Sequence, residues 1–76
     1  MEDIFEFKPG DVIYIAIYDY AEGKAKVIKN NSTNKALTFQ WLEEPSMCYR
    51  VQARIRKGEE VAVKYDDIAE VKIATW

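Results

Sequence analysis

Histidine is absent from this chain of 76 residues, and cysteine occurs once, as Cys48. Without histidine, the chain lacks the commonest general base and the commonest metal ligand. A lone cysteine has neither a partner for an internal disulfide nor a histidine to activate its thiol. We therefore expect neither a disulfide-stapled secreted domain nor a cysteine nucleophile, and we expect a reducing compartment.

Glycine and proline are scarce, with three and two residues, which excludes a linker or a low-complexity chain. Long apolar runs are missing too. The longest extends from Val12 to Tyr18, whereas a helix needs about 20 residues to span a bilayer. Residues 1–6 carry acidic rather than basic side chains, so we do not expect them to form a signal peptide. These features predict a cytoplasmic protein that has no membrane partner.

Motifs that hold metals or phosphates are also missing. The carboxylates occur in adjacent pairs such as Asp66-Asp67, and neighbouring residues on a strand point to opposite faces. The chain contains no Asp-x-Asp-x-Asp loop for calcium and no glycine-rich loop for phosphate. We therefore expect no metal site, no cofactor and no enzymatic activity.

The residues that are present suit one small domain over residues 1–76. Hydrophobic residues make up 49% of the chain and charged residues 32%, with a formal net charge of −2. A chain this short buries only about 60–65% of the surface that its unfolded form exposes, so its core must pack efficiently.

The dominant pattern along the chain has a period of two. In residues 12–20, for example, Ile13, Ile15 and Ile17 fall on one face and Tyr14 falls on the other. Such alternation is typical of antiparallel strands with one buried face. It recurs over residues 36–42, 48–57, 60–65 and 70–74. Residues 39–44 could instead form a short helix, but the β-favouring Thr38 and Phe39 indicate a strand.

Turn residues divide these segments. Pro9-Gly10 suits a type II turn, and Ala21-Glu22-Gly23 suits a three-residue hairpin loop with Gly23 in the left-handed conformation. The polar stretch over residues 29–35 is expected to be a surface loop. The first hairpin would then have the cross-strand pairs Ile17–Val27, Tyr18–Lys26 and Tyr20–Lys24.

A second hairpin is expected around Gly58. A loop at Lys57-Gly58-Glu59 keeps apolar residues opposite apolar ones and bases opposite acids. Its predicted pairs are Ile55–Val61, Ala53–Val63, Arg56–Glu60 and Arg50–Asp66. This pairing neutralises half of the row Arg50, Gln52, Arg54 and Arg56, which we interpret as a solvated face. Residues 66–69 are expected to form a single helical turn before the last strand.

Five or six short antiparallel strands, with a one-turn helix before the last, predict an all-β fold. Closure into a small barrel would remove its unpaired edges. The arrangement resembles the SH3-like barrels, a superfold shared by peptide-, RNA- and chromatin-binding modules. Locally, Ala16-Ile17-Tyr18-Asp19-Tyr20 is similar to the Ala-Leu-Tyr-Asp-Tyr stretch that opens eukaryotic SH3 domains. The chain departs from that family because Lys8-Pro9-Gly10-Asp11 precedes this stretch and no tandem tryptophan pair occurs.

The candidate binding surface is the outer face of the first hairpin. Its residues are Tyr14, Tyr18, Tyr20, Lys24 and Lys26. Aromatic rings interleaved with lysines can line a groove for a protein or peptide partner, which is the function that we favour. Alternatively, they can stack on the bases of RNA or single-stranded DNA, although a sequence pI near 5.1 counts against a nucleic acid. The same residues can also be ordinary cross-strand pairs.

Self-association is a further alternative. Trp76 lies off the face that Val71 and Ile73 share, so it either covers an end of the barrel or is exposed. An exposed Trp76 beside an edge strand could form a homodimer interface. The sequence leaves the choice between monomer and homodimer open.

Overall fold

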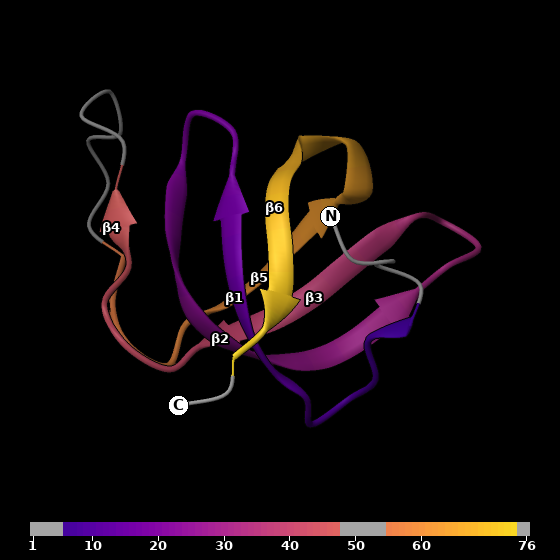
Figure 1. The fold of residues 1–76 in the computed structure, drawn as a ribbon, viewed down its shortest axis with the longest axis horizontal. Helices are drawn as coiled ribbons and strands as arrows, with labels where there is room; N and C mark the ends of the chain where they lie inside the picture. The colour runs from indigo at the N-terminus through magenta and orange to yellow at the C-terminus, as the bar shows by residue number, and fades with distance from the viewer. Residues whose placement is uncertain (1–5, 48–54, 75–76) are drawn as a thin grey trace.

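The computed structural model describes residues 6–47 and 55–74 of the chain. These residues form an all-β domain with six antiparallel strands and a 3-10 turn, η2 (Tyr65–Asp67), before the last strand (Figure 1). The strands are β1 (Val12–Ile17), β2 (Ala21–Asn31), β3 (Ala36–Trp41), β4 (Ser46–Met47), β5 (Glu60–Lys64) and β6 (Ile68–Ile73). The predicted all-β class and the helical turn before the last strand are confirmed, with η2 beginning one residue earlier than expected.

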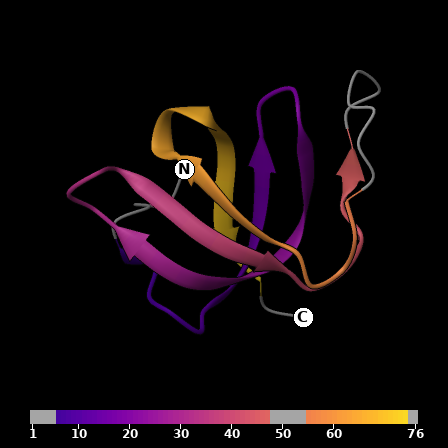
Figure 2. The ribbon, with the colours of Figure 1, turned by 180° about the vertical axis from the view of Figure 1, so that it is seen from behind.

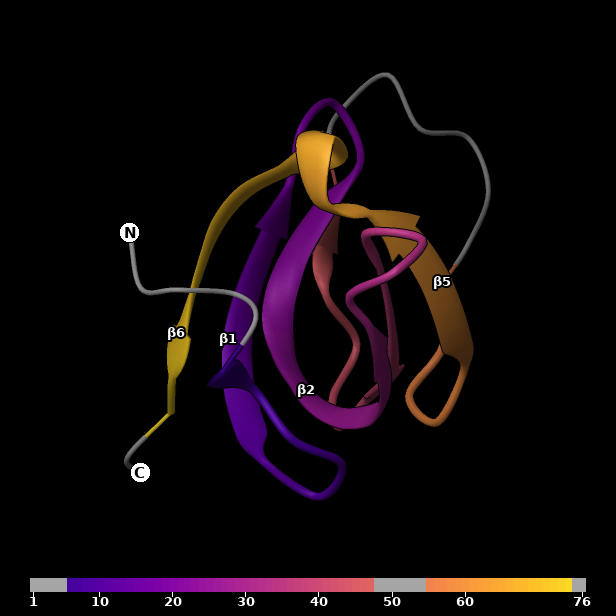
Figure 3. The same cartoon turned by 90° about the vertical axis from the view of Figure 1, so that its right-hand side faces the viewer.

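The strands form one sheet in the order β5-β3-β2-β1-β6, and the short β4 pairs with the start of β2 (Figure 2). The sheet is strongly curved, and the long β2 bends through it (Figure 3). A β-bulge interrupts the β2–β3 ladder, because the register shifts between Val27 and Lys29. Among the described residues no ladder joins β5 to β6. Instead, η2 connects them. At the β1–β2 turn, Tyr18 N donates a hydrogen bond to Asp67 O (2.9 Å), and at the β2–β3 turn Tyr65 N donates to Lys35 O (2.9 Å).

The concave face of the sheet holds the core. Alternate residues of β1 and β3 are fully or almost fully buried, as the period-two pattern predicts. The largest of them are Trp41 and Phe39, whose rings meet edge to face with centroids 4.9 Å apart. The buried apolar residues are Phe7, Ile13, Ile15, Ile17, Ala21, Ala25, Val27, Leu37, Phe39, Trp41, Ile55, Val63, Ile68 and Val71.

The predicted register of the first hairpin is wrong. The turn lies at residues 18–20, so Tyr14 pairs with Lys24 and Ile15 with Gly23. Asp19 adopts the left-handed conformation (φ 54°), which aspartate tolerates better than most residues. Gly23 is therefore a strand residue rather than a turn residue. The error leaves the faces unchanged, because the partners shift by an even number of residues.

The predicted surface loop over residues 29–35 is also too long. β2 continues to Asn31, and only residues 32–35 form the turn. Tertiary hydrogen bonds hold this polar segment in the sheet, because the Asn30 amide donates to the Phe7 carbonyl (2.9 Å) and the Tyr65 hydroxyl donates to Asn30 Oδ1.

The turns at Gly10 and Gly58 are confirmed, and both glycines have positive φ, at 95° and 91°. The second hairpin is not. Val61 pairs with Phe39 in β3, and Ile55 lies outside any strand, so the predicted Ile55–Val61 pair is wrong. Glu60 pairs with Gln40, so Arg56–Glu60 is wrong as well. The Gly58 amide donates to the Trp41 carbonyl (2.8 Å), which attaches this turn to the end of β3.

Several predictions concern residues outside the described part of the chain. They are the pairs Ala53–Val63 and Arg50–Asp66, the Arg50, Gln52 and Arg54 positions of the basic row, and the position of Trp76.

Candidate functional site

The structure divides the five predicted surface residues into two groups. Tyr14, Lys24 and Lys26 lie on the outer face of β1 and β2, with Tyr14 directly opposite Lys24. Tyr18 and Tyr20 instead lie in the turn between these strands. Tyr18 is 64% exposed, whereas Tyr20 packs against the core. The predicted face with three tyrosines is therefore not formed.

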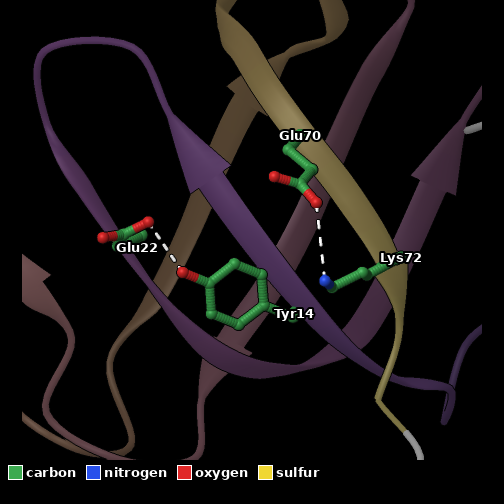
Figure 4. A network of polar contacts seen from close by, with 4 residues as sticks. All are labelled: Tyr14, Glu22, Glu70 and Lys72. Atoms are coloured by element: carbon green, nitrogen blue, oxygen red, sulfur yellow. Dashed lines mark hydrogen bonds and ion pairs between the residues drawn. The ribbon is translucent and has the colours of Figure 1, made fainter. Parts of the chain in front are cut away.

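Tyr14 belongs to a polar network on the outer face (Figure 4). Its hydroxyl donates a hydrogen bond of 2.7 Å to Glu22 Oε2. Lys72 Nζ lies 5.5 Å from the centre of the Tyr14 ring and 3.6 Å from Glu70 Oε1. The hydrogen bond to Glu22 raises the pKa of Tyr14 to about 12, and burial and the charges of Glu22 and Glu70 act in the same direction.

This network follows from the observed register. Tyr14 stands between Lys24 on β2 and Lys72 on β6, and Ala16 stands between Glu22 and Glu70. A row of bases thus lies next to a row of acids. The Tyr14 hydroxyl is hydrogen-bonded to Glu22, and Lys72 lies over the face of the Tyr14 ring.

An open groove of about 230 Å³ lies beside the β1–β2 turn. Ile17, Tyr20 and Met47 contribute apolar surface to it, together with two alanines. Its polar lining comes from Asp19, Glu22 and Ser46. As far as the described residues go, the lining contains two carboxylates and no basic side chain.

Gly23 positions the far wall of this groove. A Cβ atom at Gly23 would lie 3.2 Å from the Cα of Pro45 and 3.4 Å from Cζ3 of Trp41, so glycine permits Pro45 to approach β2 closely. Immediately after Pro45, Ser46 and Met47 pair with Glu22 and Ala21 as β4. Met47 remains 39% exposed at the margin of the groove.

Of the residues that line the groove, Tyr20 is among the predicted site residues, whereas Asp19, Glu22 and Met47 are not. The pattern predicts a strand at Asp19 and a loop at Glu22, and β4 has only two residues, too few for any periodicity. Four of the five residues of the Ala16–Tyr20 stretch line the groove.

No protein-family model matches the chain, and neither a curated protein sequence nor a solved structure is significantly similar to it. Over residues 6–47 and 55–74, no helix is long and apolar enough to cross a membrane. The same residues contain no cluster of three or more cysteine or acidic side chains placed to hold a metal ion.

Proposed function

We propose that this chain is a non-enzymatic peptide-binding module with an SH3-like barrel fold, and that an extended peptide occupies the groove beside the β1–β2 turn. The curved antiparallel sheet and the turn η2 before its last strand support the barrel. The groove itself carries the proposal, because it joins exposed apolar surface to carboxylates.

The lining defines the chemistry of the peptide. Ile17, Tyr20 and Met47 accept an apolar side chain, and Asp19 and Glu22 attract a lysine or arginine next to it. Tyr18, in the same turn and 64% exposed, offers a further aromatic surface for a partner.

Nuclear magnetic resonance with a peptide library tests this function. Peptides selected for binding should contain basic and apolar residues, and their amide shift changes should centre on residues 16–22 and 46–47. Met47→Asp should abolish these shifts while the fold persists. Ala62→Asp is the matched control, since it adds the same charge at an exposed position on β5. Shifts that centre elsewhere, or equal effects of the two variants, would refute the proposal.

Asp19→Asn tests the electrostatic contribution separately. Asparagine also tolerates the left-handed conformation of residue 19, so the turn is preserved. We expect affinity for a basic peptide to fall about 1.5- to 5-fold and to depend less on salt, as is typical for loss of one exposed charge pair.

Binding of RNA or single-stranded DNA is the alternative proposal. The observed arrangement supports it less well, because Tyr14 is held by Glu22 and Lys72, and Tyr20 packs against the core.

A further inference from the structure

Strand β6 is an edge strand of the sheet. One of its edges pairs with β1, and among the described residues no strand pairs with the other. Ile73, near the end of β6, is 42% exposed although it shares a face with the buried Val71. An edge strand with an exposed apolar side chain is a template for pairing with a further strand.

The direction of the backbone groups along β6 follows from one hydrogen bond. Ala74 N donates to Val12 O (3.0 Å), which makes Ala74 and Val12 a hydrogen-bonded pair. In an antiparallel ladder such pairs alternate, so Lys72 and Glu70 also direct their N–H and C=O groups toward β1. Val71 and Ile73 must then direct theirs outward, to the unpaired edge.

The side chains on the outer face of β6 have opposite charges. Glu70 and Lys72 are two residues apart, their side chains are 53% and 50% exposed, and they form an ion pair of 3.6 Å with each other. Such a pair is self-complementary under a two-fold rotation. A second β6 strand, antiparallel to the first and centred on Val71, places Glu70 opposite Lys72 and Lys72 opposite Glu70.

We propose that β6 pairs with β6 of a second copy of this chain, antiparallel and centred on Val71, so that two sheets join into one across a two-fold axis. The two Val71 residues face each other as a hydrogen-bonded pair, because their N–H and C=O groups point outward. The Glu70–Lys72 pairs flank it at positions that are not hydrogen-bonded, where opposing side chains come closest. Ile73 lies opposite Ala69 of the other copy, where a register shift in the β1–β6 ladder leaves Ala69 without a partner in β1.

Other registers fail on one of these points. A two-fold axis at Glu70 or Lys72 places like charges opposite each other at the centre of the interface. A shift by one residue reverses the faces of one strand relative to the other. A strand of another protein could use the same backbone groups, but it would match the order of the two charges only by chance. The self-complementary charges therefore favour a second copy as the occupant.

Charge reversal tests this dimer by analytical ultracentrifugation over a wide range of concentration. The wild-type protein should dimerise. Glu70→Lys and Lys72→Glu should each raise the dimer dissociation constant about tenfold or more, because two attractive pairs become two repulsive ones. An equimolar mixture of the two variants should restore dimers, since all four cross-strand positions then hold opposite charges. The double variant Glu70→Lys/Lys72→Glu should dimerise by itself.

Two further variants complete the test. Lys64→Glu, a charge reversal on the exposed face of β5, should leave the dissociation constant unchanged. Ile73→Pro removes an outward N–H without removing a bond to β1, so it should give a folded monomer, which circular dichroism would verify. A wild-type monomer at every concentration would overturn the proposal. A dissociation constant that neither single charge reversal changes would also overturn the proposal. So would an equimolar mixture of the two variants that does not form dimers.

Discussion

The substitution Gly23→Ala tests how the groove is formed, because the added Cβ atom must displace its neighbours. The added Cβ atom would lie 3.2 Å and 3.3 Å from the Cα and Cβ atoms of Pro45 and 3.4 Å from the Trp41 ring. Pro45 and Trp41 are both buried, so neither can move aside freely. We therefore expect Gly23→Ala to push the β4 segment away from β2.

Two opposing contributions determine the size of the effect. Alanine restricts the unfolded chain, which stabilises a protein by about 0.4–1 kcal/mol where the native backbone permits it. Overpacking a filled core costs about 1–3 kcal/mol. The second contribution is larger, so we expect a net loss of about 1–2 kcal/mol in the free energy of unfolding. For a domain of this size, each kcal/mol lowers the melting temperature by about 4–8 °C.

Urea denaturation followed by far-ultraviolet circular dichroism measures this loss. Ala25→Gly is the matched control, because it makes the opposite change at the next inward position of β2, which is fully buried. Both variants should be less stable than the wild type, but only Gly23→Ala should also weaken binding in the groove. If Gly23→Ala is as stable as the wild type or more so, Pro45 does not restrict this position and the reasoning is wrong.

The other predictions concern the outer face and the core. The pKa of Tyr14 rises from about 10 in the unfolded chain to about 12 in the fold, so its hydrogen bond to Glu22 stabilises the protein below pH 10 and is lost between pH 10 and 12. At such an exposed position, the hydrogen bond should contribute about 1 kcal/mol or less to the free energy of unfolding. Urea titrations at alkaline pH should show this pH dependence in the wild type and not in Tyr14→Phe. Phe39→Ala should cost about 3–5 kcal/mol, measured by the same titrations, because Phe39 is fully buried. If the chain binds RNA or single-stranded DNA through the outer face and the exposed Tyr18 of the β1–β2 turn, binding of an oligonucleotide should be detectable at low salt, weaken steeply as salt rises and be weaker for Tyr18→Ser. No mobility shift at low salt would eliminate that function.

The faces of the strands could be predicted from the sequence, but their partners could not. Ile13, Ile15 and Ile17 alternate with less buried residues, and this period alone places them in the core. The choice of turn depended on Gly23, whose reason for being glycine is the approach of Pro45, 22 residues later in the chain. No local pattern contains that information, so the hairpin loop was placed at Gly23 instead of at Asp19.

The candidate site shows the same division. The outward placement of Tyr14, Lys24 and Lys26 follows from alternation, and it was predicted correctly. The partners that hold Tyr14 in place come from the register of β2 and from β6, and neither was accessible from the sequence. The groove needs Met47, which β4 brings to the β1–β2 turn although nothing around it alternates.

The pairing of β1 with β6 has a consequence for the order of folding. Ile13 meets Ile73 in that ladder, so its two strands come from distant parts of the chain, whereas β1, β2 and β3 are joined by short turns. Pairings across long sequence separations form slowly, because the intervening chain must first be ordered. We expect β1–β2–β3 to assemble first, with the edge of β1 open until β6 arrives. During that interval β6 of another molecule can occupy the same edge, so concentrated refolding should produce strand-exchanged dimers that dilution alone does not separate quickly.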